Sequence, residues 1–208
     1  MPIVNRISAY HDDMREWRRD IHKHPELAYN EHRTASKVAE LLKTFGVDEI
    51  VEGIGGTGLV GVIRNGEGRS IGLRADMDAL PITEDTGVAY TSVNEGVMHA
   101  CGHDGHTTML LGAAKYLAET KNFSGTIVLI FQPAEEGYAG ARAMMEDGLF
   151  DRFPVDEIYG VHNMPGVAQG EITVSPGPVM AAADSFLVTV KGSGGHGAMP
   201  HLAIDPVV

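Results

Sequence analysis

The chain has 208 residues, 43% hydrophobic and 21% charged, and a formal net charge of −12, which is typical of one ordinary globular domain or slightly more. The negative charge argues against nucleic acid or an anionic membrane as a partner. No apolar run approaches the ~18 residues of a membrane-spanning helix, residues 1–13 lack the apolar region of a signal peptide, and the single cysteine cannot form an internal disulfide, so we expect a cytoplasmic protein.

The first part of the chain predicts two helices and a hairpin. Apolar residues at three- and four-residue spacing predict amphipathic helices over residues 7–23 and 34–45, and Gly46 occupies the usual position just beyond a helix end. Two β-branched runs, GLVGVI and SIGLRAD, flank the turn sequence NGEG at 65–68. This arrangement predicts that the two runs pair as a β-hairpin.

The middle of the chain alternates helix and strand patterns. Residues 107–120 and 139–150 predict helices, whereas the run GTIVLIF at 125–131 and the segment VDEIYGVH at 155–162 predict strands. The continuous apolar run is typical of a strand that is buried on both faces. We therefore predict the α/β class, with a mixed, largely parallel sheet and helices on both faces.

The composition changes near residue 180. The segment SPGPVMAAADS is typical of a linker, and FLVTV at 186–190 predicts a new alternating strand. We predict one domain over 1–181 and the beginning of a second, small α+β unit over 182–208. Because a unit of this length is too short to fold alone, we expect either a truncated chain or part of a longer one.

Three predicted strands lead straight into acidic or imidazole side chains. Asp76 and Asp78 follow the run IGLR, Glu135 and Glu136 follow IVLIFQPA, and His162 follows IYGV. Binding sites in an open α/β sheet form beyond the carboxyl ends of the strands. These side chains are therefore expected to converge on one crevice.

The stretch HACGHDGH at 99–106 holds the only cysteine, Cys101, close to His103 and His106. Each candidate alone also has a structural explanation. Aspartates cap turns and helices, glutamates in a first helical turn interact with the helix dipole, a histidine can lie satisfied in a core, and a cysteine often packs as a small apolar side chain. Their joint occurrence at successive strand ends instead predicts a metal site.

The donor types indicate which metals the site would take. Nitrogen, thiolate and carboxylate donors together suit zinc or another borderline divalent ion better than magnesium or calcium. The candidates outnumber the four ligands of one tetrahedral zinc, which predicts two ions that share a bridging ligand. Glu135 and Glu136 point in different directions because they are neighbours, so one can bind metal while the other acts as general base on a bound water.

Five motifs give the chain a specific resemblance. RADMDALP, MHACGHDGH, QPAEEG, GVHNMP and GSGGHGAMPH occur in the order found in hippurate hydrolases and N-acyl-amino-acid amidohydrolases. These enzymes belong to a metallopeptidase-like superfamily with aminoacylase and carboxypeptidase G. The segment RRDIHKHPELAYNE is similar to the N-terminal helix and HPE turn of that group. The similarity runs from about residue 10 to Val208, and it implies a zinc-peptidase-like catalytic domain followed by an inserted lid.

The resemblance also implies a role for each matching residue. The metal ligands would be Cys101, which bridges the two ions, His103, Glu136 and His162. Glu135 would be the general base, Asp78 the supporting catalytic aspartate, and His196, in the lid, the histidine that stabilises the oxyanion of a substrate, often in a neighbouring subunit. Asp76 is a weaker candidate than Asp78, and His106, His22, His24 and His99 are interpreted as structural.

The activity implied is that of a metal-dependent amidohydrolase that cleaves the amide bond of N-acyl amino acids, hippurate-like or N-acetyl conjugates. Two divalent ions (Zn, Mn, Ni or Co) per full-length subunit and a homodimer or homotetramer through the lid belong to the same expectation. A dipeptidase on the same scaffold and a non-catalytic truncated module for binding or oligomerisation remain alternatives, although Cys101 favours the amidohydrolase branch. Family members are nearly twice as long, and their last metal-binding histidine has no counterpart before Val208, so we expect this chain alone to bind metal incompletely and to be inactive.

Overall fold

A computed structural model describes residues 4–182, 184 and 186–208. The chain divides into two units, one that ends at Val167 and one that comprises Ala168–Val208. No helix among the described residues is long and apolar enough to cross a lipid bilayer.

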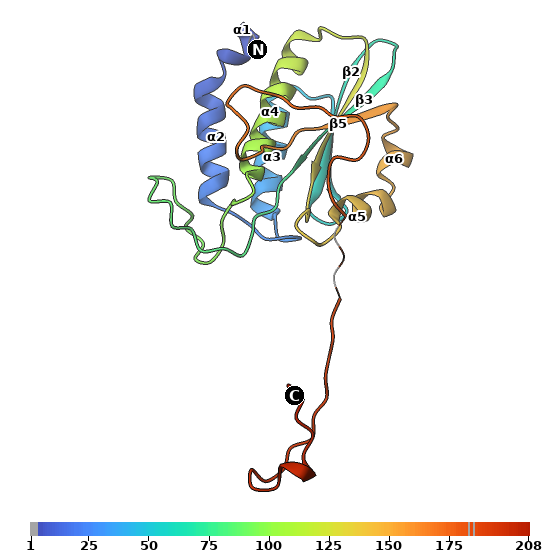
Figure 1. The fold of residues 1–208 in the computed structure, drawn as a ribbon. Helices are drawn as coiled ribbons and strands as arrows, with labels where there is room; N and C mark the ends of the chain where they lie inside the picture. Colours follow the sequence, from blue (N-terminus) through green and yellow to red (C-terminus); the bar gives the residue numbers. More distant parts are fainter. Residues whose placement is uncertain (1–3, 183, 185) are drawn as a thin grey trace. The chain divides into compact units, whose positions relative to one another are not determined.

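The first unit is built on a five-stranded mixed sheet, which confirms the predicted α/β class (Figure 1). Its strands are β1 (Glu49–Ile54), β2 (Gly58–Asn65), β3 (Ser70–Asp76), β4 (Gly125–Gln132) and β5 (Glu157–Gly160), in the order β1-β2-β4-β3-β5. β2 pairs antiparallel with both β1 and β4. β3 pairs parallel with both β4 and β5. The parallel strands therefore end at the same edge of the sheet, where the predicted site residues follow.

The predicted hairpin between the two runs around 65–68 is wrong. β4 lies between β2 and β3, with Leu129 opposite Gly61 on one side and opposite Leu73 on the other. The reason is that β4 carries apolar residues on both faces and is almost entirely buried, so it occupies a central place in the sheet. The hairpin that does form joins β1, a strand the sequence pattern did not predict, to β2.

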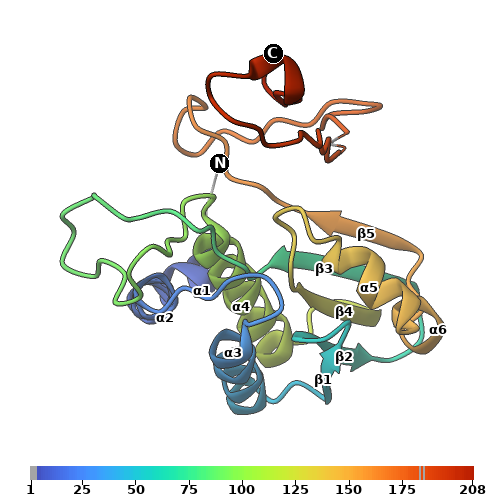
Figure 2. The same ribbon diagram turned by 90° about the horizontal axis from the view of Figure 1, so that it is seen from below.

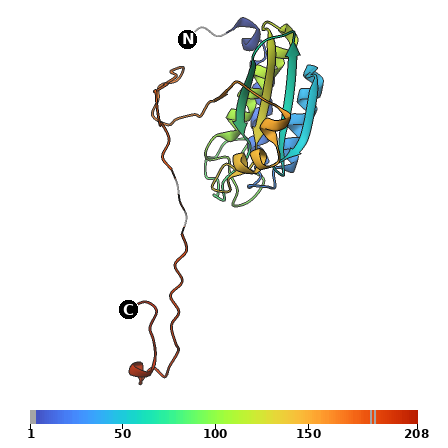
Figure 3. The same cartoon turned by 90° about the vertical axis from the view of Figure 1, so that its right-hand side faces the viewer.

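Helices cover both faces of the sheet, as predicted (Figure 2). α1 (Asn5–Ser8), α2 (His11–Lys23), α3 (His32–Phe45) and α4 (His103–Thr120) lie on one side, and α5 (Gly140–Glu146) and α6 (Leu149–Arg152) lie on the other. Figure 3 looks onto the sheet from the side of α5 and α6, which lie in front of the strands, with the helices of the other layer behind. Alternate residues of β4 serve the two cores: Leu129 and Phe131 pack with α3 and α4, whereas Val128 and Ile130 pack against Met144 of α5.

Two of the predicted helices are interrupted. The helix predicted over 7–23 stops at Ser8 and begins again at His11, with buried Tyr10 at the start of α2. The helix predicted over 139–150 breaks after Glu146 because Gly148 adopts a left-handed conformation with φ of 83°. The end of α3 is as predicted, with Gly46 in the left-handed conformation just past Phe45.

The second unit contains little regular structure. Its described elements are the 3₁₀ helix η1 (Pro200–Leu202) and a bridge between Ser193 and Ile204. The strand predicted over 186–190 does not form, because none of the described residues pairs with it and Phe186 and Leu187 are 89% and 91% exposed. The second unit begins at Ala168, and both the predicted domain division at 181–182 and the assignment of 182–208 to a lid stay predictions.

Candidate metal centre

The predicted site residues of the first unit meet beyond the carboxyl ends of the parallel strands. Asp76 ends β3, Glu135 and Glu136 follow β4 through a short turn, and His162 follows β5. Cys101 and His103 lie at the start of α4. Ligand atoms lie within 4.8 Å of one another in three groups: Cys101, His103 and His162; His103, Glu135 and Glu136; and Asp76, His103 and His106. His103 belongs to all three and is the centre of the cluster.

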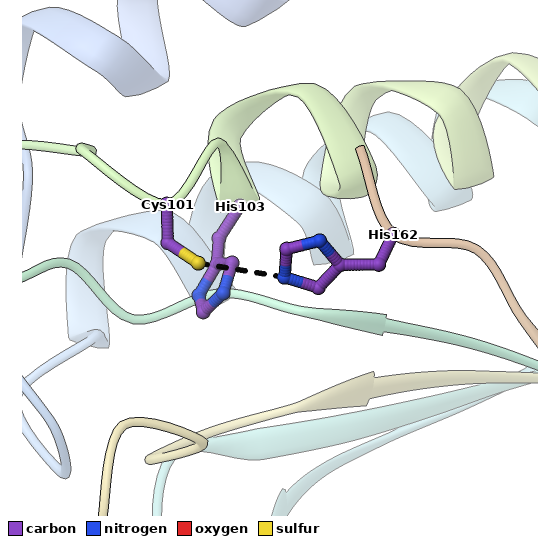
Figure 4. Close-up of side chains that lie close together, drawn as sticks. All are labelled: Cys101, His103 and His162. Carbon is purple, nitrogen blue, oxygen red and sulfur yellow. Dashed lines mark hydrogen bonds between the residues drawn. The ribbon is translucent and has the colours of Figure 1, made fainter. Parts of the chain in front are cut away.

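Cys101 and His162 face each other directly, with the ring of His103 beside them (Figure 4). Cys101 Sγ lies 3.4 Å from His162 Nε2, and His162 Nδ1 donates to the carbonyl of Asn163 at 2.6 Å, which directs Nε2 toward the thiol. Burial, together with the negative charge of Glu136, raises the pKa of the Cys101 thiol to about 12. A divalent cation would reverse this effect, because a coordinating thiol is deprotonated. His162 is exposed, so the interpretation as a core histidine is wrong for it.

His103 is fully buried and has one ring nitrogen without a partner. Its Nδ1 donates to the backbone carbonyl of Asp78 at 2.8 Å, and its Nε2 has no hydrogen-bond partner. That Nε2 lies 3.8 Å from Glu136 Oε1 and 3.9 Å from Glu135 Oε2, distances too long for hydrogen bonds. An unpaired buried nitrogen is costly. Its lone pair, with carboxylates around it, fits a divalent cation bound between these atoms.

Asp78 connects His103 to the turn that carries the two glutamates. Its Oδ2 accepts the backbone N–H of Glu136 at 2.9 Å, and its Oδ1 lies 3.3 Å from His103 Nδ1. Burial alone would raise the pKa of Asp78, but His103 and the amides of Glu136 and Glu135 outweigh it and hold the pKa below its usual value. Asp78 therefore stays ionised and contacts a candidate ligand, and its role as the supporting catalytic aspartate stays a prediction.

Asp76 and His106 form a separate buried pair beside His103. Asp76 Oδ1 lies 2.7 Å from His106 Nδ1, and its Oδ2 is 2.8 Å from Arg74 Nη1. Burial opposes ionisation, but His106 and Arg74 prevail and lower the pKa of Asp76 to about 2. His106 Nε2 accepts the N–H of Asn163 at 3.0 Å. Because both of its nitrogens are engaged, the geometry supports a structural role for His106.

The remaining histidines lie outside the cluster. His22 bridges Asp104 at 2.9 Å and Glu84 at 3.2 Å, and burial lowers the pKa of His99 to about 4. His196 belongs to the second unit, where its Nδ1 accepts the N–H of Ala198 at 3.1 Å, so its catalytic role stays a prediction.

Sequence reasoning missed two groups that shape the centre. Arg74 pairs with Asp76 as described, and the buried Glu31 accepts the N–H of Ala134, directly before the two glutamates, at 2.8 Å. Arg74 precedes Asp76 by two residues in β3, so the two lie on the same face of the strand, a signal that was available. Glu31 lies 103 residues from Ala134, and no local pattern links them.

Comparisons with known proteins place the chain in a family. The sequence pattern of peptidase family M20/M25/M40 matches residues 72–206. Hippurate hydrolase of Campylobacter jejuni is 50% identical over 208 residues, which is 100% of this chain and 54% of that protein. The chain spans about half the length of the curated relatives it matches.

Two solved structures are also similar. A putative aminohydrolase from methicillin-resistant Staphylococcus aureus is 40% identical with a TM-score of 0.79, and the match covers 97% of this chain and 54% of that one. A dinuclear metal-binding M20 peptidase from Bacillus subtilis is 41% identical with a TM-score of 0.72, and the match covers 76% and 44%. The chain belongs to peptidase family M20/M25/M40.

Proposed function

We propose that the cluster around His103 is the metal centre of an amidohydrolase that cleaves the amide bond of N-acyl amino acids, either hippurate-like or N-acetyl conjugates. The observation that carries the proposal is the unpaired, buried Nε2 of His103, with carboxylate oxygens of Glu135 and Glu136 at 3.8–3.9 Å. The similarity to a hippurate hydrolase supports the substrate class.

Cys101, His103, Glu136 and His162 would hold two divalent ions, with Cys101 as the shared ligand. Zn, Mn, Ni and Co all accept this mixture of nitrogen, sulfur and oxygen donors. When bound, the ions would supply an activated water and polarise the carbonyl of the amide. The dinuclear M20 peptidase supports the count of two.

Glu135 suits the proton transfers of this reaction. Its side chain is 39% exposed, whereas that of Glu136 is 24% exposed, so Glu135 can reach both the centre and an incoming substrate. It would accept the proton of the attacking water and return it to the amine that leaves. Asp78 would hold His103 in its orientation, and His196 would donate a hydrogen bond to the tetrahedral oxyanion.

The assembly and the compartment are proposals too. The second unit would begin a lid through which the protein forms a homodimer or homotetramer, so that His196 serves a neighbouring subunit. The single cysteine supports the cytoplasm as compartment.

The test is the variant Glu135→Gln, which keeps the shape of the side chain and removes its basicity. Because the chain spans half the length of its relatives, the assay uses it both alone and fused to the part of the Campylobacter hippurate hydrolase that the alignment leaves uncovered. Benzoyl-, acetyl- and indole-acetyl amino acids are offered with Zn²⁺, Mn²⁺, Ni²⁺ or Co²⁺. We expect Glu135→Gln to lower kcat about 10²–10⁴-fold, the contribution of a general base, while the metal content measured by mass spectrometry stays unchanged.

The matched control is Glu146→Gln, at an exposed glutamate in the last turn of α5, which should leave kcat unchanged. Substantial residual turnover by Glu135→Gln would remove Glu135 as the base. Fast hydrolysis of dipeptides with none of N-acyl amino acids would replace the proposed substrate class by the dipeptidase alternative.

A further inference from the structure

Glu31 is a buried carboxylate that the proposed reaction does not use. It lies directly before α3 and is 0% exposed. Its Oε1 accepts the N–H of Ala134 at 2.8 Å, and its Oε2 accepts the hydroxyl of Thr57. No lysine, arginine or histidine among the residues that the structure describes forms an ion pair with it. Its oxygens instead accept hydrogen bonds from two segments far away in the sequence, the turn between β1 and β2 and the turn after β4.

The turn after β4 needs such support. Ala134 has φ of 52°, a left-handed conformation that costs a residue with a Cβ free energy. The next two residues are the proposed base Glu135 and the proposed ligand Glu136. Glu31 holds the backbone on one side of this pair, and Asp78 holds it at the Glu136 N–H, at 2.9 Å.

A second contact braces the same turn from the same segment. The hydroxyl of Tyr29, two residues before Glu31, donates to the carbonyl of Tyr138 at 3.0 Å. The segment between α2 and α3 therefore contacts the turn before and after the two glutamates. Both contacts join backbone atoms of the turn, so they set its path independently of what the glutamate side chains bind.

We propose that Glu31 is a positioning residue of the metal centre: its carboxylate fixes the strained backbone at Ala134 and thereby sets where Glu135 and Glu136 stand. The proposal rests on the proposed function. It assigns to Glu31 no contact with metal or substrate. Groups that orient metal ligands typically change metal affinity 10–100-fold when they are removed, and that is the scale expected for Glu31.

Three variants separate positioning from a merely structural role. Glu31→Met keeps the bulk and removes both acceptors. Glu31→Gln keeps an oxygen for the Ala134 N–H and an amide N–H that can donate to the Thr57 hydroxyl, so it should rescue. Glu26→Met is the matched control, because Glu26 lies in the same segment and accepts the N–H groups of Arg33 and Thr34 at 3.0 and 2.8 Å. It supports the start of α3 without touching the turn.

The measurements on the 208-residue chain are Zn²⁺ affinity by competition with a chromophoric chelator, exchange of the Ala134 amide by NMR, and the unfolding temperature. We expect Glu31→Met to weaken Zn²⁺ binding about 10–100-fold and to speed exchange at Ala134. Glu31→Gln should stay near wild type, and Glu26→Met should lower the unfolding temperature with little change in Zn²⁺ affinity. Unchanged affinity in Glu31→Met, or an equal loss in Glu26→Met, would overturn the proposal.

Glu31→Asp serves if Glu31→Met does not fold. Aspartate keeps the charge but is one methylene shorter, so it cannot reach both Ala134 and Thr57. We expect weaker Zn²⁺ binding and faster Ala134 exchange in this variant. Wild-type values of both would overturn the proposal. If neither the wild-type chain nor its fusion to the uncovered part of the Campylobacter hippurate hydrolase binds Zn²⁺, the proposed function fails. Ala134 exchange then decides whether Glu31 positions the turn: equal rates in Glu31→Met and Glu26→Met would contradict it.

Discussion

Asp76 and Asp78 differ in their partners although they lie only two residues apart. Asp76 pairs with Arg74 and His106, and Asp78 supports His103 and the amide of Glu136. Residues two apart in an extended chain point to the same face, so spacing does not tell which aspartate faces the metal centre. Both carboxylates approach His103, with Asp76 Oδ2 3.6 Å from its Nε2 and Asp78 Oδ1 3.3 Å from its Nδ1, but only Asp78 also binds the turn that carries the two glutamates.

Asp76→Asn should destabilise the fold, because its amide N–H₂ would face the Arg74 guanidinium in place of a carboxylate oxygen. The substitution would also weaken the hydrogen bond between His106 and the buried charge of Asp76; a bond of this kind contributes about 1.5–3 kcal/mol, so the free energy of unfolding should fall by about that amount. Urea denaturation in the presence of EDTA measures it without a metal contribution. Asp85→Asn, at an exposed aspartate, should change it by less than about 0.5 kcal/mol. A similarly small change in Asp76→Asn would contradict this account of the pair.

A network of hydrogen bonds and ion pairs joins the elements α2 and α4 to the segment 80–98. His22 of α2 lies between Asp104 of α4 and Glu84, which also accepts the N–H of Ser92 at 2.7 Å. Arg18 of α2 approaches Asp104 at 3.0 Å. The rings of Tyr90 and His99 lie 5.5 and 6.4 Å from that of His22. This network fixes the segment that leads to Cys101.

The stability that His22 contributes should depend on pH. The hydrogen bond to Asp104, and then that to Glu84, raise the pKa of His22 against the effect of burial. A raised pKa in the folded state means that the contribution is full below the unfolded value of about 6.5 and is lost as the pH rises through the folded value. The unfolding temperature of His22→Gln should therefore fall furthest below that of wild type at about pH 6, and the gap should narrow toward pH 9.

Scanning calorimetry in EDTA checks this dependence. His11→Gln, at an exposed histidine of α2, is the control and should follow wild type at every pH. A gap between His22→Gln and wild type that stays constant from pH 6 to 9, or widens, would show that His22 is not held as a cation between the two carboxylates.

The sequence predicts an element well when a local pattern of residues determines it. It does not predict the order of the strands, because that order depends on pairing between distant segments. The apolar run of β4 and the spacing of α3 are local, and both elements form where expected. The partner of β2 depends instead on which strand best fills the centre of the sheet, and β4, from 60 residues further along, displaces β3. The strand ends still converge as predicted, because three parallel strands end at one edge whichever order they take.

The two units of the molecule differ in how much of each is buried and in where the proposed ligands lie. The proposed ligands Cys101, His103, Glu136 and His162 all lie in the first unit, as do both hydrophobic cores. Among the described residues of 168–208, none is buried. The alternating pattern at 186–190 predicted a strand that does not form, because a strand needs a neighbour to pair with and the pattern carries no information about one.

A chain that ends at Val167 should therefore keep the fold and the metal affinity of the 208-residue chain. A change of 1 kcal/mol would shift the unfolding temperature by about 2–4 °C at this size, so agreement within about 2 °C in calorimetry, with equal Zn²⁺ affinity, is the expected result. A chain that ends at Phe153 is the contrasting control, because it lacks β5 and His162, and it should lose both stability and Zn²⁺ binding. If the unfolding temperature and the Zn²⁺ affinity of the chain that ends at Val167 fall as much as those of this control, residues 168–208 stabilise the first unit. The metal centre then depends on more than the five strands and the ligands that follow them.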